Sequence, residues 1–239
     1  MTRGICSFFL LFLSAAPFSY AQSIGQVQTI STEDIQSYLN QINHYAIIYN
    51  GRAEDLYHLS YTNHPYLGPD DFSVGTLCHS DIIYTNVMIR YDMHRGNLLV
   101  KNGQSAIAIE LDKEKVNWAA FNGYKIVAAK EVDWENVPDS HFLILLHEGT
   151  YPIMKISASF SRDKVSNQTV EHYFEFKNRY YICVNGVCFP LKNKKSLLNH
   201  FADKRRELDQ YAKQIMLDFR KNPEVAYVEL VKHYERLTR

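Results

Sequence analysis

Apolar and polar side chains alternate along several stretches between residues 107 and 176. Two of these stretches have a mainly apolar face, formed by Met154, Ile156, Ala158 and Phe160 in the first and by Val170, His172, Phe174 and Phe176 in the second. A third stretch places Ile107, Ile109 and Leu111 on one side. A period of two residues is that of a β-strand in a sheet buried on one face. These stretches are therefore predicted to be strands.

Three Asn-Gly dipeptides, at residues 102, 122 and 185, separate apolar runs. Both residues tolerate the positive φ angles of a type I′ turn, so this arrangement is a strong signal of β-hairpins. The predicted strand pairs are 98–101 with 104–111, 116–121 with 124–129, and 180–184 with 187–191.

Two further apolar runs, 83–91 and 142–146, bring the predicted sheet to about ten strands. Short connections between consecutive strands favour an antiparallel meander. Such a sheet must protect its edges, either by closing into a barrel or by folding into a sandwich. The sequence does not decide between these two architectures.

Apolar positions with helical spacing bracket the predicted sheet. Before it, Ser31 and Asp34 resemble a capping box, and an apolar stripe follows at Ile35, Leu39, Ile42 and Ala46. After it, a helix predicted to begin near Ser196 has its stripe at Leu208, Tyr211, Ala212, Ile215 and Phe219. Asn222-Pro223-Glu224 then signals a last helix, with its stripe at Ala226, Leu230, Val231, Tyr234 and Leu237. The predicted fold class is mainly β (α+β), with an N-terminal helix and C-terminal amphipathic helices.

The first residues have the pattern of a signal peptide. Arg3 supplies a positive charge, residues 5–18 are largely apolar, and small residues precede a predicted cleavage site between Ala21 and Gln22. The apolar run is shorter than the roughly 20 residues that span a bilayer. We therefore predict export to the periplasm or the extracellular space, with no transmembrane segment after cleavage. The predicted organisation is a signal peptide (1–21), an N-terminal helix with an antiparallel β-domain (22–191), and C-terminal helices packed on that domain (192–239).

Charge is distributed unevenly along the predicted mature chain. Residues 22–191 contain 13 basic and 19 acidic side chains, a net charge of −6, whereas residues 192–239 contain 12 and 7, a net charge of +5. The near balance of the whole argues against nucleic acid as the partner. The basic C-terminal part either docks on the acidic β-domain or contacts anionic lipid or glycan.

Cys183 and Cys188 flank the last of the three predicted turns. If Val184 and Val187 close that turn as a hydrogen-bonded pair, the cysteines form the next pair, with Cα atoms about 4.5 Å apart. In an oxidising compartment this spacing predicts a disulfide, and the alternative is two reduced strand residues. A zinc site is disfavoured because no second Cys or His pair stands nearby at ligand spacing. Cys78 is expected to be buried and inert.

Signatures of common enzymes are absent from the sequence. It contains no G-x-S-x-G, H-E-x-x-H, P-loop or dinucleotide-binding pattern, so no cofactor and no metal is expected. His141 and His147 bracket the run 142–146, which should hold them too far apart to share an ion. Paired carboxylates could still support glycoside hydrolysis, and the candidates are Asp70, Asp71, Glu131, Asp133 and Glu135.

Tyrosine is abundant, with 17 residues in the chain. Tyr57, Tyr61 and Tyr66 lie close together in a region that also contains His58, His64, Pro65 and Pro69. Aromatic rings with polar ends suit stacking on sugars or lining a peptide groove. They are also common in strands for structural reasons. Both interpretations stay open at this point.

Several short segments resemble a group of uncharacterised exported proteins from Bacteroidota: Ile48-Tyr49-Asn50-Gly51, Arg90-Tyr91-Asp92, and the tail from Phe201-Ala202-Asp203-Lys204 through Glu207-Leu208 to Tyr234. The resemblance covers most of the predicted mature chain. It implies an envelope or secreted location and transfers no activity or site residue. The first functional hypothesis is a non-enzymatic secreted or periplasmic protein that binds a small ligand or an envelope protein. The alternative is a glycan- or peptide-directed hydrolase with a non-standard acidic site.

Overall fold

A computed structural model describes residues 46–103, 105–166 and 169–239, all of them within the unit Gln41–Arg239. The strands are β1 (Arg52–Ala53), β2 (Ser73–His79), β3 (Ile82–Asp92), β4 (Asn97–Lys101), β5 (Ala108–Glu110), β6 (Val116–Phe121), β7 (Tyr124–Ala128), β8 (Phe142–His147), β9 (Ile153–Ser166), β10 (Thr169–Val184) and β11 (Val187–Leu191). The helices are α2 (Lys194–Leu198), α3 (Arg205–Gln214) and α4 (Pro223–Leu237), with short 3₁₀ turns η1 (Lys113–Lys115), η2 (Ala129–Glu131) and η3 (Ala202–Lys204).

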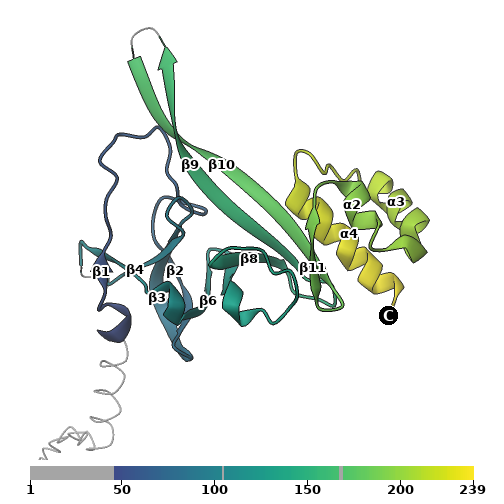
Figure 1. The fold of residues 1–239 in the computed structure, drawn as a ribbon, viewed down its shortest axis with the longest axis horizontal. Helices are drawn as coiled ribbons and strands as arrows, with labels where there is room; N and C mark the ends of the chain where they lie inside the picture. The colour runs from purple at the N-terminus through teal and green to yellow at the C-terminus, as the bar shows by residue number, and fades with distance from the viewer. Residues whose placement is uncertain (1–45, 104, 167–168) are drawn as a thin grey trace, which may run out of the picture. The chain divides into compact units, whose positions relative to one another are not determined.

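The eleven strands form a single antiparallel sheet, in the order β1-β5-β4-β3-β2-β6-β7-β8-β9-β10-β11 (Figure 1). Within the described residues no pairing joins β1 to β11, so the sheet is open and does not close into a barrel. The predicted class, mainly antiparallel β with C-terminal helices, is confirmed. The strand order differs from the simple meander that we predicted. β6 pairs with β2 instead of β5, so two meanders meet at the centre of the sheet.

Two of the three predicted turns have the expected backbone. Asn122 and Gly123 have φ angles of 47° and 76°, and Asn185 and Gly186 have φ angles of 51° and 79°. These are the positive values that a type I′ turn requires. The third hairpin is confirmed as a pairing of 98–101 with part of 104–111, but its two-residue turn was predicted wrongly. Lys101 pairs with Ala108, so the connection that includes Asn102-Gly103 is longer than two residues and β5 is shorter than predicted.

Two hydrophobic cores lie along one face of the sheet, since the register places Ile144 of the first core and Leu191 of the second on the same side. The inner face of β2–β8 packs around large buried side chains, among them Tyr84, Ile89, Leu98, Ile126 and Ile144. At the other end of the sheet, Ile153, Ile182 and Leu191 form a second core with Leu208, Leu230 and Tyr227 of α3 and α4. Figure 1 shows these helices gathered beside β11. Most of the predicted apolar stripes are thus buried against the sheet, whereas Ile215 and Leu237 are exposed.

The helical region is more divided than we predicted. In place of one helix from Ser196 to Phe219, the chain forms α2, η3 and α3, and α3 ends at Gln214. α2 begins at a capping box in which Asn193 accepts a bond from the Ser196 amide. The predicted N-terminal helix over 31–46 lies outside the described residues except for its last residue, as do Ala21 and Gln22. No helix in the described ranges is long and apolar enough to cross a membrane.

The strands β9 and β10 extend well beyond their neighbours. β8 pairs with β9 only as far as Lys155, and β11 pairs with β10 only from Tyr180 onward. Residues 156–166 and 169–179 therefore form a two-stranded hairpin, which we call the arm (Figure 1). A two-stranded ribbon is marginally stable alone. The arm therefore needs contacts with other segments.

The segment 54–67, which we call the strap, supplies contacts on one edge of the arm. The Thr62 amide donates to the His172 carbonyl oxygen over 2.9 Å. The Asn63 side chain accepts a 2.7 Å bond from the Phe174 amide and donates a 2.9 Å bond to its carbonyl oxygen. An asparagine side chain thus replaces a neighbouring strand on this edge.

The turn between β3 and β4 supplies contacts on the other edge of the arm. The Ser159 amide donates to the Met93 carbonyl oxygen over 3.2 Å, and the His94 ring nitrogen Nδ1 lies 2.9 Å from the Ser159 carbonyl oxygen. Backbone groups of Ser159 on one edge of the arm and of His172 and Phe174 on the other are therefore bonded from within the protein.

Alkaline pH is expected to destabilise the contact between the sheet and the C-terminal helices. Burial, followed by the charge of Glu224, raises the pKa of Tyr180 from 10.0 to about 12. Burial, followed by Tyr151 and Asp203, raises the pKa of Tyr234 likewise to about 12. The stability that these neutral tyrosines contribute is complete below pH 10.0 and is lost as pH rises through about 12, because the unfolded chain ionises first.

Thermal unfolding followed by circular dichroism across this pH window checks the prediction. The double variant Tyr180→Phe, Tyr234→Phe should lose less stability over the same window than the parent protein. Equal losses in the two proteins would contradict the assignment to these tyrosines.

Candidate ligand-binding site

A pocket of about 560 Å³ lies on the outer face of β7, β8 and β9, the face turned away from the core of β2–β8. Its apolar lining is formed by Val127, Val132, Leu143, Leu145, Pro152 and Met154. Leu143 and Met154 also contact the disulfide in a small outer core. The size and apolar lining are those of pockets that hold small organic ligands.

The register of the sheet extends the apolar lining beyond the pocket. Residues directly opposite each other on antiparallel strands lie on the same face. Successive pairs across five strands give an unbroken row of Ile83, Cys78, Trp118, Val127 and Leu143. Ile83, at the far end of the row, is 61% exposed. The pocket therefore opens onto an apolar row that crosses the outer face of the sheet.

One wall of the pocket is the loop after η2, which contains Trp134. The loop is fixed by backbone bonds to the β10–β11 hairpin: the Glu135 amide donates to the Gly186 carbonyl oxygen, and the Cys188 amide donates to the Glu135 carbonyl oxygen, over 2.8 and 2.9 Å. Trp134 is 37% exposed. Among the residues that the structure describes, no ring or cation stacks on its indole.

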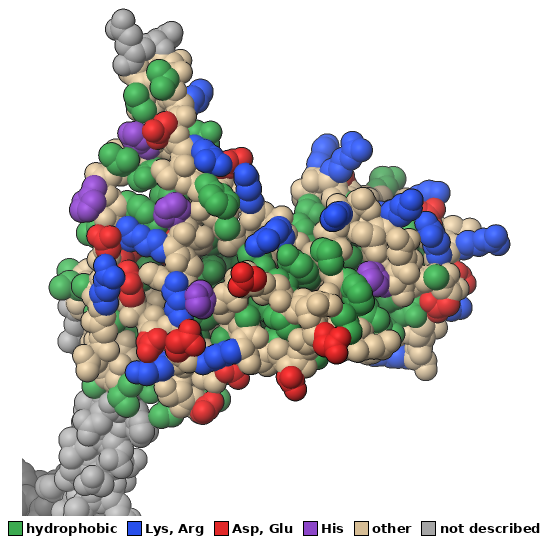
Figure 2. Space-filling view, in the orientation of Figure 1, with side chains coloured by type: hydrophobic (Ala, Val, Ile, Leu, Met, Phe, Trp, Pro, Cys, Tyr) green, Lys and Arg blue, Asp and Glu red, His purple; other side chains and the backbone are tan. Residues whose placement is uncertain are grey.

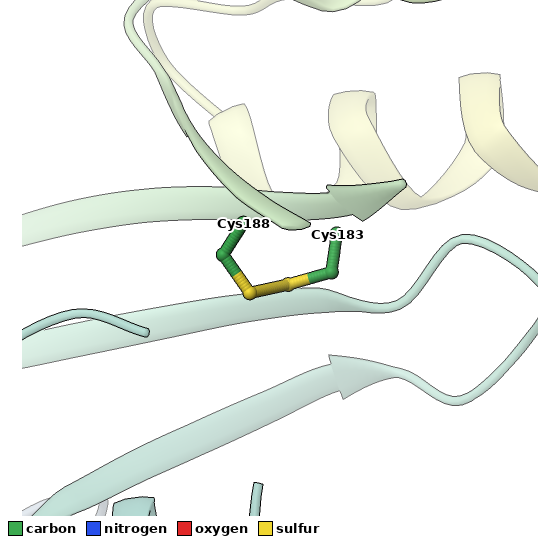
Figure 3. Close-up of a disulfide and its surroundings, with 2 residues drawn as sticks. All are labelled: Cys183 and Cys188. Carbon is green, nitrogen blue, oxygen red and sulfur yellow. A yellow bond between two sulfur atoms is a disulfide. The ribbon is translucent and has the colours of Figure 1, made fainter. Parts of the chain in front are cut away.

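Cys183 and Cys188 are joined within that same hairpin (Figure 3). They are paired directly across the strands, next to the Val184–Val187 pair, in the predicted register. Their Cα atoms are 4.1 Å apart. The cysteine pair thus stabilises the hairpin whose backbone holds the Trp134 loop.

Among the described residues, the charged side chains in the pocket lining are all acidic: Glu131, Asp133 and Glu148. Glu131 accepts a 3.1 Å bond from the side-chain nitrogen Nδ2 of Asn117, and Glu148 pairs with Lys125 over 2.7 Å. The two carboxylates that have partners are therefore oriented, and Asp133 stands beside Trp134 on the wall. Such a rim favours a ligand with a cationic or hydroxylated end.

The five predicted acidic candidates do not come together. Glu131 and Asp133 line the pocket, whereas Glu135 holds the Trp134 loop in place through backbone hydrogen bonds to the β10–β11 hairpin. Asp70 is remote in the fold, 69% exposed and 3.9 Å from Arg90, and its neighbour Asp71 is also exposed. In the described part of the chain no group of three His, Cys, Asp or Glu side chains is placed to hold a metal ion.

The cysteine and histidines considered in the sequence, Cys78, His141 and His147, lie outside the pocket lining. Cys78 is buried and forms no disulfide, and its thiol donates a 3.7 Å bond to Asn117 Oδ1. Burial, with Asp81 and Glu131 nearby, raises the pKa of this thiol. A thiol of this kind is a poor nucleophile. His147 Nε2 lies 2.9 Å from Glu235 Oε2 and ties β8 to α4, while His141 lies 4.0 Å from Glu114 at the opposite end of β8.

Two of the three tyrosines singled out in the sequence, Tyr57 and Tyr61, contact Phe174 of the arm, whereas Tyr66 bonds within the strap. Tyr61 stacks on Phe174 with ring centroids 4.2 Å apart. Tyr57 donates a 2.6 Å bond to the buried carboxylate of Asp92, and burial, followed by this bond, raises the pKa of Tyr57. Tyr66 donates to Glu54 over 3.0 Å. None of the three lines the pocket.

The strap is anchored through a buried ion pair. Arg90 Nη2 lies 2.9 and 3.0 Å from the two carboxylate oxygens of Glu54, and the side chains are 13% and 5% exposed. The guanidinium lies over the rings of Tyr66 and Phe72, 3.8 and 4.2 Å from their centroids. The polar residues of this region thus hold the fold together around the arm.

Sequence reasoning missed Trp134, Glu148 and the apolar floor of the pocket. Trp134 stands between Asp133 and Glu135, which were both candidates, so an aromatic residue among acids was an available signal. Glu148 and Met154 reach the pocket only through the pairing of β8 with β9, which the sequence pattern does not specify. Comparisons with protein-family models, with curated proteins and with solved structures gave no match, so the pocket is interpreted from its own chemistry.

Proposed function

We propose that this is an exported, non-enzymatic protein that binds a small amphiphilic ligand in the pocket beside Trp134. The observation that carries the proposal is an apolar pocket whose charged lining residues, within the described ranges, are all acids. The ligand has an apolar body and a cationic end. The signal-peptide pattern and the resemblance to exported proteins support the export, and the cysteine pair is compatible with an oxidising compartment.

The two parts of the ligand meet different parts of the site. Transfer of each methylene group from water to the pocket and the outer apolar row contributes about 0.8 kcal/mol. A cation at the rim gains from the carboxylates and from the open face of the Trp134 indole, for which cation–π attraction is worth about 0.5–2 kcal/mol. Apolar burial supplies affinity, and the acids supply selection of charge.

Dodecyltrimethylammonium, used below its micelle concentration, is expected to bind and dodecyl sulfate to bind much more weakly. The chain has two tryptophans, Trp134 on the wall and Trp118 in the apolar row, so intrinsic fluorescence reports the binding. Trp134→Ala should weaken binding of the cationic probe about tenfold, a loss of about 1.4 kcal/mol in binding free energy. Asp133→Asn should reduce the difference in affinity between the cationic and the anionic probe.

Glu171→Gln is the matched control for Asp133→Asn, because Glu171 is an exposed acid on the arm. It changes the net charge equally and should leave both affinities unchanged. Equal affinity for the two probes, or full affinity in Trp134→Ala, would refute the proposed site.

The second candidate function is a glycan- or peptide-directed hydrolase. The observation that favours it is that two of the candidate acids, Glu131 and Asp133, line one pocket. Turnover of chromogenic glycosides or peptides by the parent protein, abolished in both Glu131→Gln and Asp133→Asn, would support this alternative. Turnover that survives in both variants would exclude these acids as the catalytic pair.

Export has its own test. Protein recovered from outside the cytoplasm is expected to begin at Gln22, because the predicted peptidase site follows Ala21. N-terminal sequencing or intact mass measures this directly. A retained Met1 on exported protein would contradict the prediction.

A further inference from the structure

We propose that the connection between α3 and α4 is a membrane-contact loop that docks the protein on the surface of an anionic lipid bilayer. The loop comprises residues 215–222. It is independent of the ligand pocket, to which it contributes no residue. Three features of the loop carry the inference: its exposed apolar side chains, the backbone conformation of Met216, and the basic residues around it.

The loop and the first turn of α4 expose large apolar side chains to solvent. Met216 is 87% exposed, the highest value among the large apolar residues of the described chain. Ile215 and Val225 are 41% and 59% exposed. Leu217 and Phe219, by contrast, pack into the core between the sheet and the helices. The loop is therefore anchored at two positions and presents apolar side chains from a fixed base.

Hydrogen bonds define the geometry that places Met216 outward. The Leu217 amide donates to the Ala212 carbonyl oxygen over 2.9 Å, and the Met216 amide donates to the Lys213 carbonyl oxygen over 3.2 Å. This pair of bonds is the Schellman motif that ends many helices. Met216 occupies its left-handed position, with φ of 53°.

Glycine is the favoured residue at that position, because a side chain is strained in the left-handed region. The chain instead places a long, flexible apolar side chain there and leaves it in water. A residue that is unfavourable for the backbone and unused in the core points to a contact outside the protein.

Basic side chains surround the exposed methionine. Arg220 and Lys221 are exposed, and neither forms an ion pair with any residue that the structure describes. Lys213, at the end of α3, is 74% exposed and pairs with Asp209 over 2.8 Å. Nearby acids are already engaged: Asp218 accepts bonds from the Arg220 and Lys221 amides, which lower its pKa, and Glu224 pairs with Lys155.

The charge of the wider region agrees with that of the loop. Residues 192–239 have a net charge of +5. Several Lys and Arg side chains lie on the helical part of the face shown in Figure 2. Apolar side chains that enter the headgroup layer, together with cations that meet anionic lipids, are the two components of peripheral membrane binding. A bilayer with anionic lipids therefore matches both properties of this surface.

Co-sedimentation with vesicles tests the proposal. The full chain should bind vesicles of equimolar phosphatidylglycerol and phosphatidylcholine and bind pure phosphatidylcholine weakly. Raising salt from about 0.01 M to about 1 M shortens the screening length from about 30 Å to about 3 Å and should release most of the protein. Because all variants share the same N-terminal residues, differences among them report on the loop.

Met216→Gly separates the contact from the fold. Glycine suits the left-handed position, so the melting temperature should not fall, whereas vesicle binding should weaken about tenfold through loss of the apolar side chain. Arg220→Gln with Lys221→Gln should weaken binding at low salt by at least tenfold and reduce its salt dependence. Lys177→Gln with Arg179→Gln, two exposed cations on the arm, is the charge-matched control and should bind like the parent protein.

Several results would overturn the proposal. Parent-like binding by Met216→Gly, or equal loss in the arm control, would show that the loop is not the contact. A lower melting temperature in Met216→Gly would show that the methionine serves the fold. Binding to heparin beads without binding to vesicles would identify an anionic glycan instead. Loss of a dimer on Met216→Gly in analytical ultracentrifugation would identify a second copy of the chain as the occupant.

Discussion

Replacement of Leu208 by aspartate is expected to unfold the protein or reduce it to an aggregating state. Leu208 lies on α3 with none of its surface exposed, in the core that joins the helices to the end of the sheet. Loss of its apolar burial costs about 1.5–3 kcal/mol, and a carboxylate without a partner adds a desolvation cost. A sum of about 4 kcal/mol or more is a large part of a typical stability of about 5–15 kcal/mol.

Urea unfolding followed by circular dichroism measures this effect. Gln210→Asp is the matched control, since it adds the same charge to an exposed position of the same helix and should change stability by less than about 0.5 kcal/mol. Truncation after Leu191 should have the same outcome as Leu208→Asp, because it uncovers Ile153, Ile182 and Leu191. A truncated chain that stays soluble with an unchanged melting temperature would show that the helices are an independent module.

Glu54→Ala is expected to lower the free energy of unfolding by about 3–5 kcal/mol. The change leaves the Arg90 guanidinium, which is only 13% exposed, without its carboxylate partner. It also removes the acceptor of the Tyr66 hydroxyl. The strap would then lose its anchor, and the arm would lose the contacts that the strap provides.

A second variant distinguishes the destabilisation caused by removing one partner from the net contribution of the intact ion pair to stability. Replacing both Glu54 and Arg90 by methionine removes the buried charges together and should recover most of the lost stability. Glu171→Gln, which breaks an exposed pair with Lys164 at 3.9 Å, should cost less than about 1 kcal/mol. If Glu54→Ala were as mild as Glu171→Gln, Arg90 would have to be satisfied by other groups, with Asp70 the nearest acid.

Local features of the fold were predictable because they depend on residues close together in the sequence. The turns at Asn122-Gly123 and Asn185-Gly186 follow from the tolerance of both residues for positive φ. The pairing of Cys183 with Cys188 follows from the second of these turns, since the turn fixes the register. Alternation along β9 and helical stripes in α3 and α4 likewise follow from the period of the backbone.

Features that depend on distant residues were not predictable in this way. Nothing in the local pattern places β6 beside β2, because alternation shows that a segment is a strand without showing which strand it pairs with. The sequence pattern also predicted a helix that continues past Gln214, whereas the Schellman turn at Met216 ends α3 there. The pattern is misleading because Leu217 and Phe219 pack into the same core from a loop.

The candidate site divides along the same line. The sequence by itself determined the strands, the cysteine hairpin and the acids at 131 and 133. Only the tertiary structure decided that these acids share a pocket with Leu143 and Met154, because strand register brings those residues together. It likewise decided that Tyr57 and Tyr61 hold the arm, since their ring contacts with Phe174 and the bond between Tyr61 and Ser161 join residues that lie far apart in the sequence.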